Sequence, residues 1–205
     1  MMLDRWQDLW RRLGASEVDE GLFHQLVASY SEPHRKYHTM QHLDECFGHL
    51  ARLAPFAERP AEVELALWFH DAIYNTRKKD NEKRSAKWAT DSILAAGLSD
   101  DLASRVHDLI MATVHNAVPE GKDAEVLVDI DLAIIGADQE RFNEFEVQVR
   151  EEYSWVPGFL FRPARRQILE EFARRKHIYS TELFRSERES QARKNLARSF
   201  ARLQG

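Results

Sequence analysis

Apolar residues recur at intervals of three and four along almost the whole chain, and this spacing constrains the fold more than any other feature. Trp6, Leu9, Trp10 and Leu13 form the first such series, and Gly14 is placed to end it. Glycine and proline, which interrupt helices, number only 8 and 6 among 205 residues. With no repeats and no long linker, the pattern predicts an all-α helical bundle that forms a single domain over residues 1–205.

Local signals predict where several helices begin and end. Ser16 with Asp19 is typical of a helix start. Pro60 predicts the first turn of a helix that runs to about Tyr74, and Ser99 predicts the N-cap of a later helix.

One segment is strand-like, "AEVLVDIDLAII", residues 124–135. Taken alone, it could form a buried strand. Because no other stretch offers a partner strand, we expect this segment to be helical.

Composition and charge exclude several classes of protein. Hydrophobic residues make up 43% and charged residues 31%, which is typical of a soluble globular protein. A net charge of -5 predicts no nucleic-acid polymer and no membrane surface as partner. No run of about 18 apolar residues is present, and the N-terminus lacks the apolar core of a signal peptide. The single cysteine, Cys46, predicts a reducing, cytoplasmic compartment.

A polar pair closes the apolar segment 64–69, and other potential ligands lie elsewhere in the chain. His70 and Asp71 follow that segment directly, and buried polar groups of this kind need partners. His38 and His42 are four residues apart, so on a helix they share one face. Imidazole and carboxylate ligands together indicate a divalent transition metal: Mn, Fe, Co, Ni or Zn.

The order His … His-Asp … Asp, in "YHTMQH", "FHDAIYN" and "VDIDLAIIG", resembles the HD superfamily of metal-dependent phosphohydrolases. Together with "DNEKRSA", "VREEY" and "ARKNL", the resemblance covers nearly the whole chain and is closest to a stand-alone branch described as predicted metal-dependent HD phosphohydrolases. It implies an HD-type helical bundle with a central site for one or two metal ions. It implies four ligands: His42, His70, Asp71 and Asp131. Asp131 is preferred to Asp129 because the second Asp of the similar "DADRL" stretch binds metal in other HD proteins, which leaves Asp129 as a capping or supporting carboxylate.

The "YHTMQH" stretch also resembles the Tyr-His-Asn-x-x-His start of cyclic-nucleotide phosphodiesterases, except that Thr39 stands where Asn is usual. This resemblance implies that His38 is the proton donor. A bound metal ion lowers the pKa of water to about 7, and the resulting metal-bound hydroxide can attack phosphorus. His38 would then protonate the leaving oxygen, and Asp71 could bridge a second ion.

Four further residues are candidates for binding the substrate: Arg35, Lys79, Glu82 and His115. Lys79 ends a run of cations that could equally be a solvated loop, and Glu82 lies where a helix is expected to start. The expected substrate is a small phosphorylated molecule, for example a nucleotide. The oligomeric state stays open.

Two alternatives stay open at this point. Some proteins of the HD fold are di-iron oxygenases, which need additional histidines, and here His107 and His115 lie in the right region. The chain could also be a non-catalytic, metal-containing module that binds a phosphorylated ligand or another protein. A zincin site is excluded because Thr39 replaces the general-base Glu of HExxH.

Overall fold

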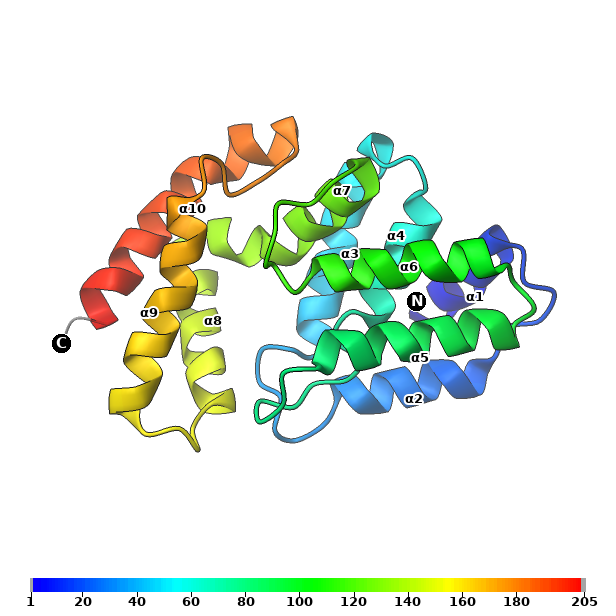
Figure 1. The fold of residues 1–205 in the computed structure, drawn as a ribbon, viewed down its shortest axis with the longest axis horizontal. Helices are drawn as coiled ribbons and strands as arrows, with labels where there is room; N and C mark the ends of the chain where they lie inside the picture. The colour runs from blue at the N-terminus through cyan, green and yellow to red at the C-terminus, as the bar shows by residue number, and fades with distance from the viewer. Residues whose placement is uncertain (1, 204–205) are drawn as a thin grey trace. The chain divides into compact units, whose positions relative to one another are not determined.

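The structure, a computed structural model, describes residues 2–203, and it confirms the all-α prediction. Over that range the chain forms ten α-helices and two short 3₁₀ helices, with no strand (Figure 1). The strand-like segment 124–135 is helical throughout, as predicted. None of the helices in this range is long and apolar enough to cross a membrane.

The chain divides into two compact units, residues 1–128 and 129–205. A single domain over residues 1–205 therefore stays a prediction. The helices of the first unit are α1 Met2–Leu13, α2 Glu20–Tyr30, α3 Met40–Leu53, η1 Ala54–Phe56, α4 Pro60–Phe69, α5 Asn81–Ala95 and α6 Asp100–Ala112. Helix α7, Lys122–Asp131, begins in the first unit and ends in the second, which continues with η2 Leu132–Gly136, α8 Gln139–Glu152, α9 Gly158–Arg174 and α10 Glu182–Leu203.

Helix α4 is the centre of the first unit. Every residue from Glu62 to Phe69 is buried, so this helix is enclosed on all sides. Its two glutamates, Glu62 and Glu64, are paired with arginines. The Trp68 ring lies 4.9 to 5.9 Å from the rings of its neighbours Trp6, Phe23 and Phe47. Packing of this density fixes the position of whatever follows Phe69.

Two predicted boundaries are wrong and two are confirmed. The second helix is capped by Asp19, whose side chain accepts from the Leu22 amide, and not by Ser16. Helix α4 does begin at Pro60, but it ends at Phe69 and not near Tyr74. The Ser99 hydroxyl caps α6 by accepting from the Leu102 amide, as predicted. Helix α9, Gly158–Arg174, is a helix that the sequence analysis does not identify.

Within the second unit, Asp129 joins the end of α7 to the start of α10. Its carboxylate is fully buried and accepts from the Ser180 amide at 2.7 Å, the Thr181 amide at 2.7 Å and the Thr181 hydroxyl at 2.6 Å. Hydrogen bonds to a charged carboxylate are stronger than those between neutral groups, so these contacts strongly stabilise the junction of α7 and α10. The expectation that Asp129 is a capping or supporting carboxylate is confirmed.

We expect Asp129→Ala to destabilise the protein by about 3 kcal/mol, because three donors lose their acceptor in a buried position. Urea unfolding followed by circular dichroism measures the effect. Asp44→Ala is the control, because Asp44 is exposed on α3. Equal unfolding midpoints for the two variants would contradict the assignment.

Candidate metal centre

Two segments of the first unit bring the predicted ligands together. Helix α3 begins after Thr39, whose hydroxyl accepts from the Gln41 amide at 3.3 Å, and His42 lies in its first turn. Thr and Asn are both N-cap residues, so Thr39 preserves the helix start despite departing from the phosphodiesterase pattern. Helix α4 ends at Phe69, so His70 and Asp71 lie in the turn that follows.

Three side chains converge in this region. His42 Nε2 lies 3.1 Å from His70 Nε2, and Asp71 Oδ2 lies 3.1 Å from His70 Nε2 and 3.6 Å from His42 Nε2. Both imidazoles are buried and the Asp71 side chain is 18% exposed. Ligands at 2.0–2.2 Å from a tetrahedral ion are separated by about 3.4 Å. The three side chains therefore fit around one divalent cation, and they belong to a group that could hold a metal ion.

The tautomer of His70 follows from its neighbour. His70 Nδ1 lies 2.8 Å from the Leu67 carbonyl oxygen, which can only accept, so Nδ1 carries the proton. His70 Nε2 is then the ring nitrogen that faces His42 and Asp71. This arrangement is typical of metal-binding histidines, whose second nitrogen donates to a carbonyl or carboxylate.

Arg35 fixes the turn that carries Asp71. Its buried guanidinium donates to the Asp71 carbonyl at 2.6 Å, the Ala72 carbonyl at 2.9 Å and the His38 carbonyl at 3.3 Å. It also pairs with Glu32 at 3.0 Å. The structure thus gives Arg35 a positioning role, and the prediction that it binds substrate stays a prediction.

A buried tyrosine lies beneath this turn. The Tyr30 hydroxyl donates to the Trp68 carbonyl at 3.1 Å. Burial raises the pKa of Tyr30 well above its ordinary value, and the charge of Asp71 acts in the same direction. Tyr30 therefore stays a neutral hydrogen-bond donor at any physiological pH.

His38, the predicted proton donor, lies beside the three ligands. Its ring is half-buried and stacks on Tyr74, with ring centroids 4.1 Å apart and planes at 26°. The centroids of the His38 and His42 rings are 6.1 Å apart. His38 is thus held next to the cluster without being one of its donors, and its acid role stays a prediction.

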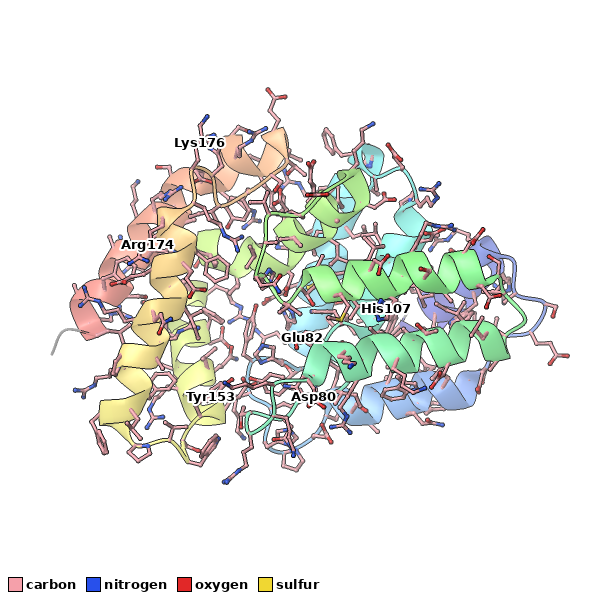
Figure 2. The ribbon with its side chains drawn as sticks, in the orientation of Figure 1. Asp80, Glu82, His107, Tyr153, Arg174 and Lys176 are labelled. Carbon is pink, nitrogen blue, oxygen red and sulfur yellow. The ribbon has the colours of Figure 1, made fainter. Side chains whose placement is uncertain are left out.

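The other predicted substrate contacts are on neighbouring segments. Glu82 is half-buried in the first turn of α5, and Lys79 is exposed in the loop before it; Figure 2 shows Glu82 at this end of α5 and His107 along α6. His115 follows α6 with a left-handed backbone, φ 58°. The Ser85 hydroxyl accepts from the Ile73 amide at 3.0 Å, which ties α5 to the turn after Asp71. Substrate binding by these residues stays a prediction.

Asp131, the predicted fourth ligand, is the last residue of α7 and is half-buried. It belongs to the second unit, whereas His42, His70 and Asp71 belong to the first. Its role as a ligand stays a prediction.

Cys46 is a potential ligand that the sequence analysis does not identify. It lies one turn after His42 on α3, is 1% exposed, and places its Sγ 3.7 Å from His42 Nε2. The sequence offered one signal for this role, the spacing of four residues that places Cys46 and His42 on the same face of a helix. A lone cysteine in an apolar helix, however, reads as a core residue.

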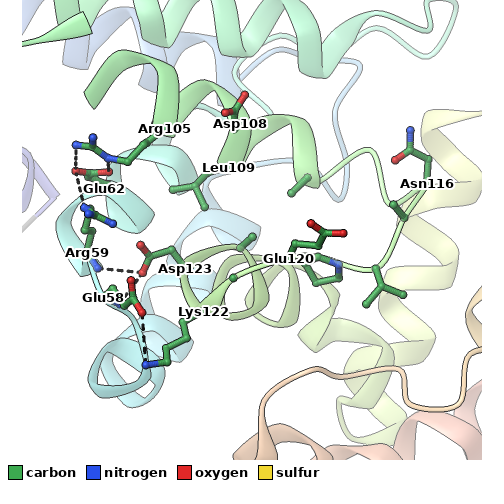
Figure 3. A pocket seen from close by; sticks show the side chains of 16 residues that line it. Glu58, Arg59, Glu62, Arg105, Asp108, Leu109, Asn116, Glu120, Lys122 and Asp123 are labelled. Atoms are coloured by element: carbon green, nitrogen blue, oxygen red, sulfur yellow. Dashed lines mark hydrogen bonds and ion pairs between the residues drawn. The ribbon is translucent and has the colours of Figure 1, made fainter. Parts of the chain in front are cut away.

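A separate pocket of the first unit lies between the start of α4, α6 and the start of α7 (Figure 3). Its charges pair with one another: Arg105 binds Glu62 at 2.7 and 2.8 Å, and Lys122 lies 3.4 Å from Glu58. The Asp123 carboxylate accepts from the Glu58 and Arg59 amides. Among the described residues that line it, none is a predicted site residue, so this pocket is not the candidate metal centre.

No family model, curated protein or solved structure matches the chain. The resemblance to the HD superfamily therefore depends on the sequence motifs, and the candidate site depends on the geometry described above.

We expect Arg35→Ala to destabilise the protein by more than about 3 kcal/mol, because it leaves three carbonyl groups without a buried donor. It should also weaken metal binding, since the turn that orients Asp71 is released. Arg35→Lys should be intermediate, because one ammonium group cannot reproduce the planar fork. Thermal unfolding and calorimetric titration with Mn²⁺ measure both effects, with Arg11→Ala, an exposed arginine of α1, as the control. Metal affinity equal to that of the wild type in Arg35→Ala would contradict the positioning role.

Proposed function

We propose that the protein is a metal-dependent phosphohydrolase that cleaves a phosphate ester of a small molecule such as a nucleotide. The buried cluster of His42, His70 and Asp71 is the observation that carries this proposal. The motif order that resembles the HD superfamily supports the same reaction. The buried Cys46, the single cysteine of the sequence, supports a reducing, cytoplasmic compartment.

The donors suit one of the divalent ions Mn, Fe, Co, Ni or Zn. His42, His70 and Asp71 would hold it, and we propose Asp131 as the fourth ligand. The motif order that resembles the HD superfamily supports this choice. A second ion, bridged by Asp71, belongs to the same proposal.

When bound, the cation supplies Lewis acidity and a water molecule of lowered pKa, the requirements for attack at phosphorus. The residues of the chain would orient the metal ligands and donate the proton. Leu67 and Arg35 hold His70 and Asp71 in a fixed orientation before any substrate arrives. His38, stacked on Tyr74, would donate a proton to the leaving oxygen.

Charged groups around the first unit would contact the substrate. Lys79 is exposed and cationic, so it can approach the phosphoryl oxygens. Glu82 and His115 are half-buried, and we propose that they contact the substrate or a second ion.

The two alternatives receive less support. A di-iron oxygenase needs further histidine ligands, and His107 is partly exposed with its Nδ1 3.1 Å from Asp108 Oδ1. A non-catalytic module would not require a stacked histidine beside the ligands. Iron content, oxygen consumption and phosphate release separate the three functions.

We expect Asp71→Ala to lower the affinity for Mn²⁺ by more than about tenfold, because this hard cation loses its carboxylate ligand. Helix content should be preserved, since Asp71 lies outside the helices. Calorimetric titration and far-ultraviolet circular dichroism measure the two effects. Asp44→Ala, two residues from His42 but exposed, is the control. An unchanged Mn²⁺ affinity would refute Asp71 as a ligand.

We expect His38→Ala to retain metal but to lower turnover of alkyl phosphates by about 10²-fold or more, because the leaving oxygen loses its proton donor. Activated aryl phosphates, which leave without a proton, should be hydrolysed nearly as fast as by the wild type. His24→Ala, at an exposed position on α2, is the control. Equal losses on both substrate classes would argue against an acid role.

A further inference from the structure

A second set of donors overlaps the candidate metal centre. Cys46 forms a group with His42 and His70 in which one potential ligand atom from each residue lies within 4.8 Å of the others. All three side chains are buried, with 1% exposure for Cys46, 2% for His42 and 1% for His70. The two histidines thus belong to two groups, one completed by a thiol and one by the Asp71 carboxylate.

The distances in this second set are close to those around a bound ion. A tetrahedral zinc ion with Zn–N near 2.0 Å and Zn–S near 2.3 Å separates nitrogen and sulfur ligands by about 3.5 Å. Here Cys46 Sγ lies 3.7 Å from His42 Nε2, and the two Nε2 atoms are 3.1 Å apart. The third separation, between Cys46 Sγ and the ligand nitrogen of His70, is at most 4.8 Å.

The thiol also lies almost equally far from both nitrogens of His42, 3.7 and 3.8 Å. The sulfur therefore packs against the ring and does not lie along the lone pair of one nitrogen. Entry of an ion would replace this contact with a metal–sulfur bond, while the Leu67 carbonyl keeps His70 in the tautomer that both sets require.

The two sets differ in chemical softness. A thiolate prefers soft or borderline cations, whereas a carboxylate prefers hard ones. We propose that Cys46 is a ligand for soft divalent cations such as Cd²⁺, which bind to His42, His70 and Cys46. Such an ion displaces the harder cation bound through Asp71, because both need the same two imidazoles. Binding releases the thiol proton to solvent, and the result is an inhibited form of the centre.

This inference rests on the metal site of the proposed function, but it is independent of the substrate. Cys46 is the only cysteine among the 205 residues, so any thiolate-to-metal absorption must come from it. The full-length protein, stripped of metal and reduced, is titrated with Cd²⁺ while the ultraviolet charge-transfer band is recorded.

We expect the band in the wild type and in Asp71→Ala, and its complete loss in Cys46→Ser and Cys46→Ala. The affinity for Cd²⁺ should fall more than about tenfold in both Cys46 variants, and the affinity for Mn²⁺ should change far less. Cd²⁺ should also release Mn²⁺ from the wild type, seen as the return of the free Mn²⁺ signal in electron paramagnetic resonance.

The outcomes separate the two proposals. A wild-type protein that binds Mn²⁺ but gives no thiolate band would overturn the role of Cys46 and leave the metal site intact. A Cd²⁺ affinity unchanged in both Cys46 variants, with circular dichroism showing normal folding, would overturn it as well. A protein that binds neither cation would overturn both.

Discussion

The fixed turn between α4 and α5 depends on one buried cation. The Arg35 side chain is fully buried, and its guanidinium donates to the carbonyl groups of Asp71 and Ala72. Removing a guanidinium from water is costly unless its donors are satisfied, so the cation and the turn stabilise each other. The rings of Tyr30 and Tyr74 lie 5.2 and 5.5 Å from the guanidinium carbon and complete its surroundings.

This interaction explains how an apolar helix can end in a polar site. Helix α4 is anchored by burial on every side, and its last turn supplies the Leu67 carbonyl that orients His70. The chain then leaves the helix, and Arg35 fixes the backbone on which Asp71 stands. His70 is thereby held by the helix, and Asp71 is held by the turn.

Much of the fold could be predicted from the sequence, because apolar spacing and caps such as Ser99 are local signals. The end of α4 could not be predicted from such local signals. Ala72, Ile73 and Tyr74 continue the apolar pattern, yet α4 ends at Phe69. Beyond this point Arg35 binds the carbonyl groups of Asp71 and Ala72, which lie 36 and 37 residues later in the chain. Helix α9 gave no clear signal, since Pro163 lies inside it and Phe159 and Leu160 are exposed.

The candidate site likewise contains residues that could be predicted from the sequence and residues that could not. His42, His70 and Asp71 could be predicted from motif order, and the structure brings them together. Arg35 was predicted to be near the site, but its contacts with carbonyl groups depend on the tertiary structure. Cys46 approaches His70 only because α3 packs beside α4, a contact between segments that periodicity cannot reveal.

The hydrogen bond from His70 to Leu67 has a further consequence for any metal ion that the candidate centre would hold. In small zinc domains, the ion itself supplies the free energy that folds the chain. Here the His70 imidazole is oriented by helix α4, which the hydrophobic core already holds in place. An ion held at this site would therefore enter and leave a chain that stays folded, so the occupant of the site would follow the metal supply of the cell throughout the protein's lifetime.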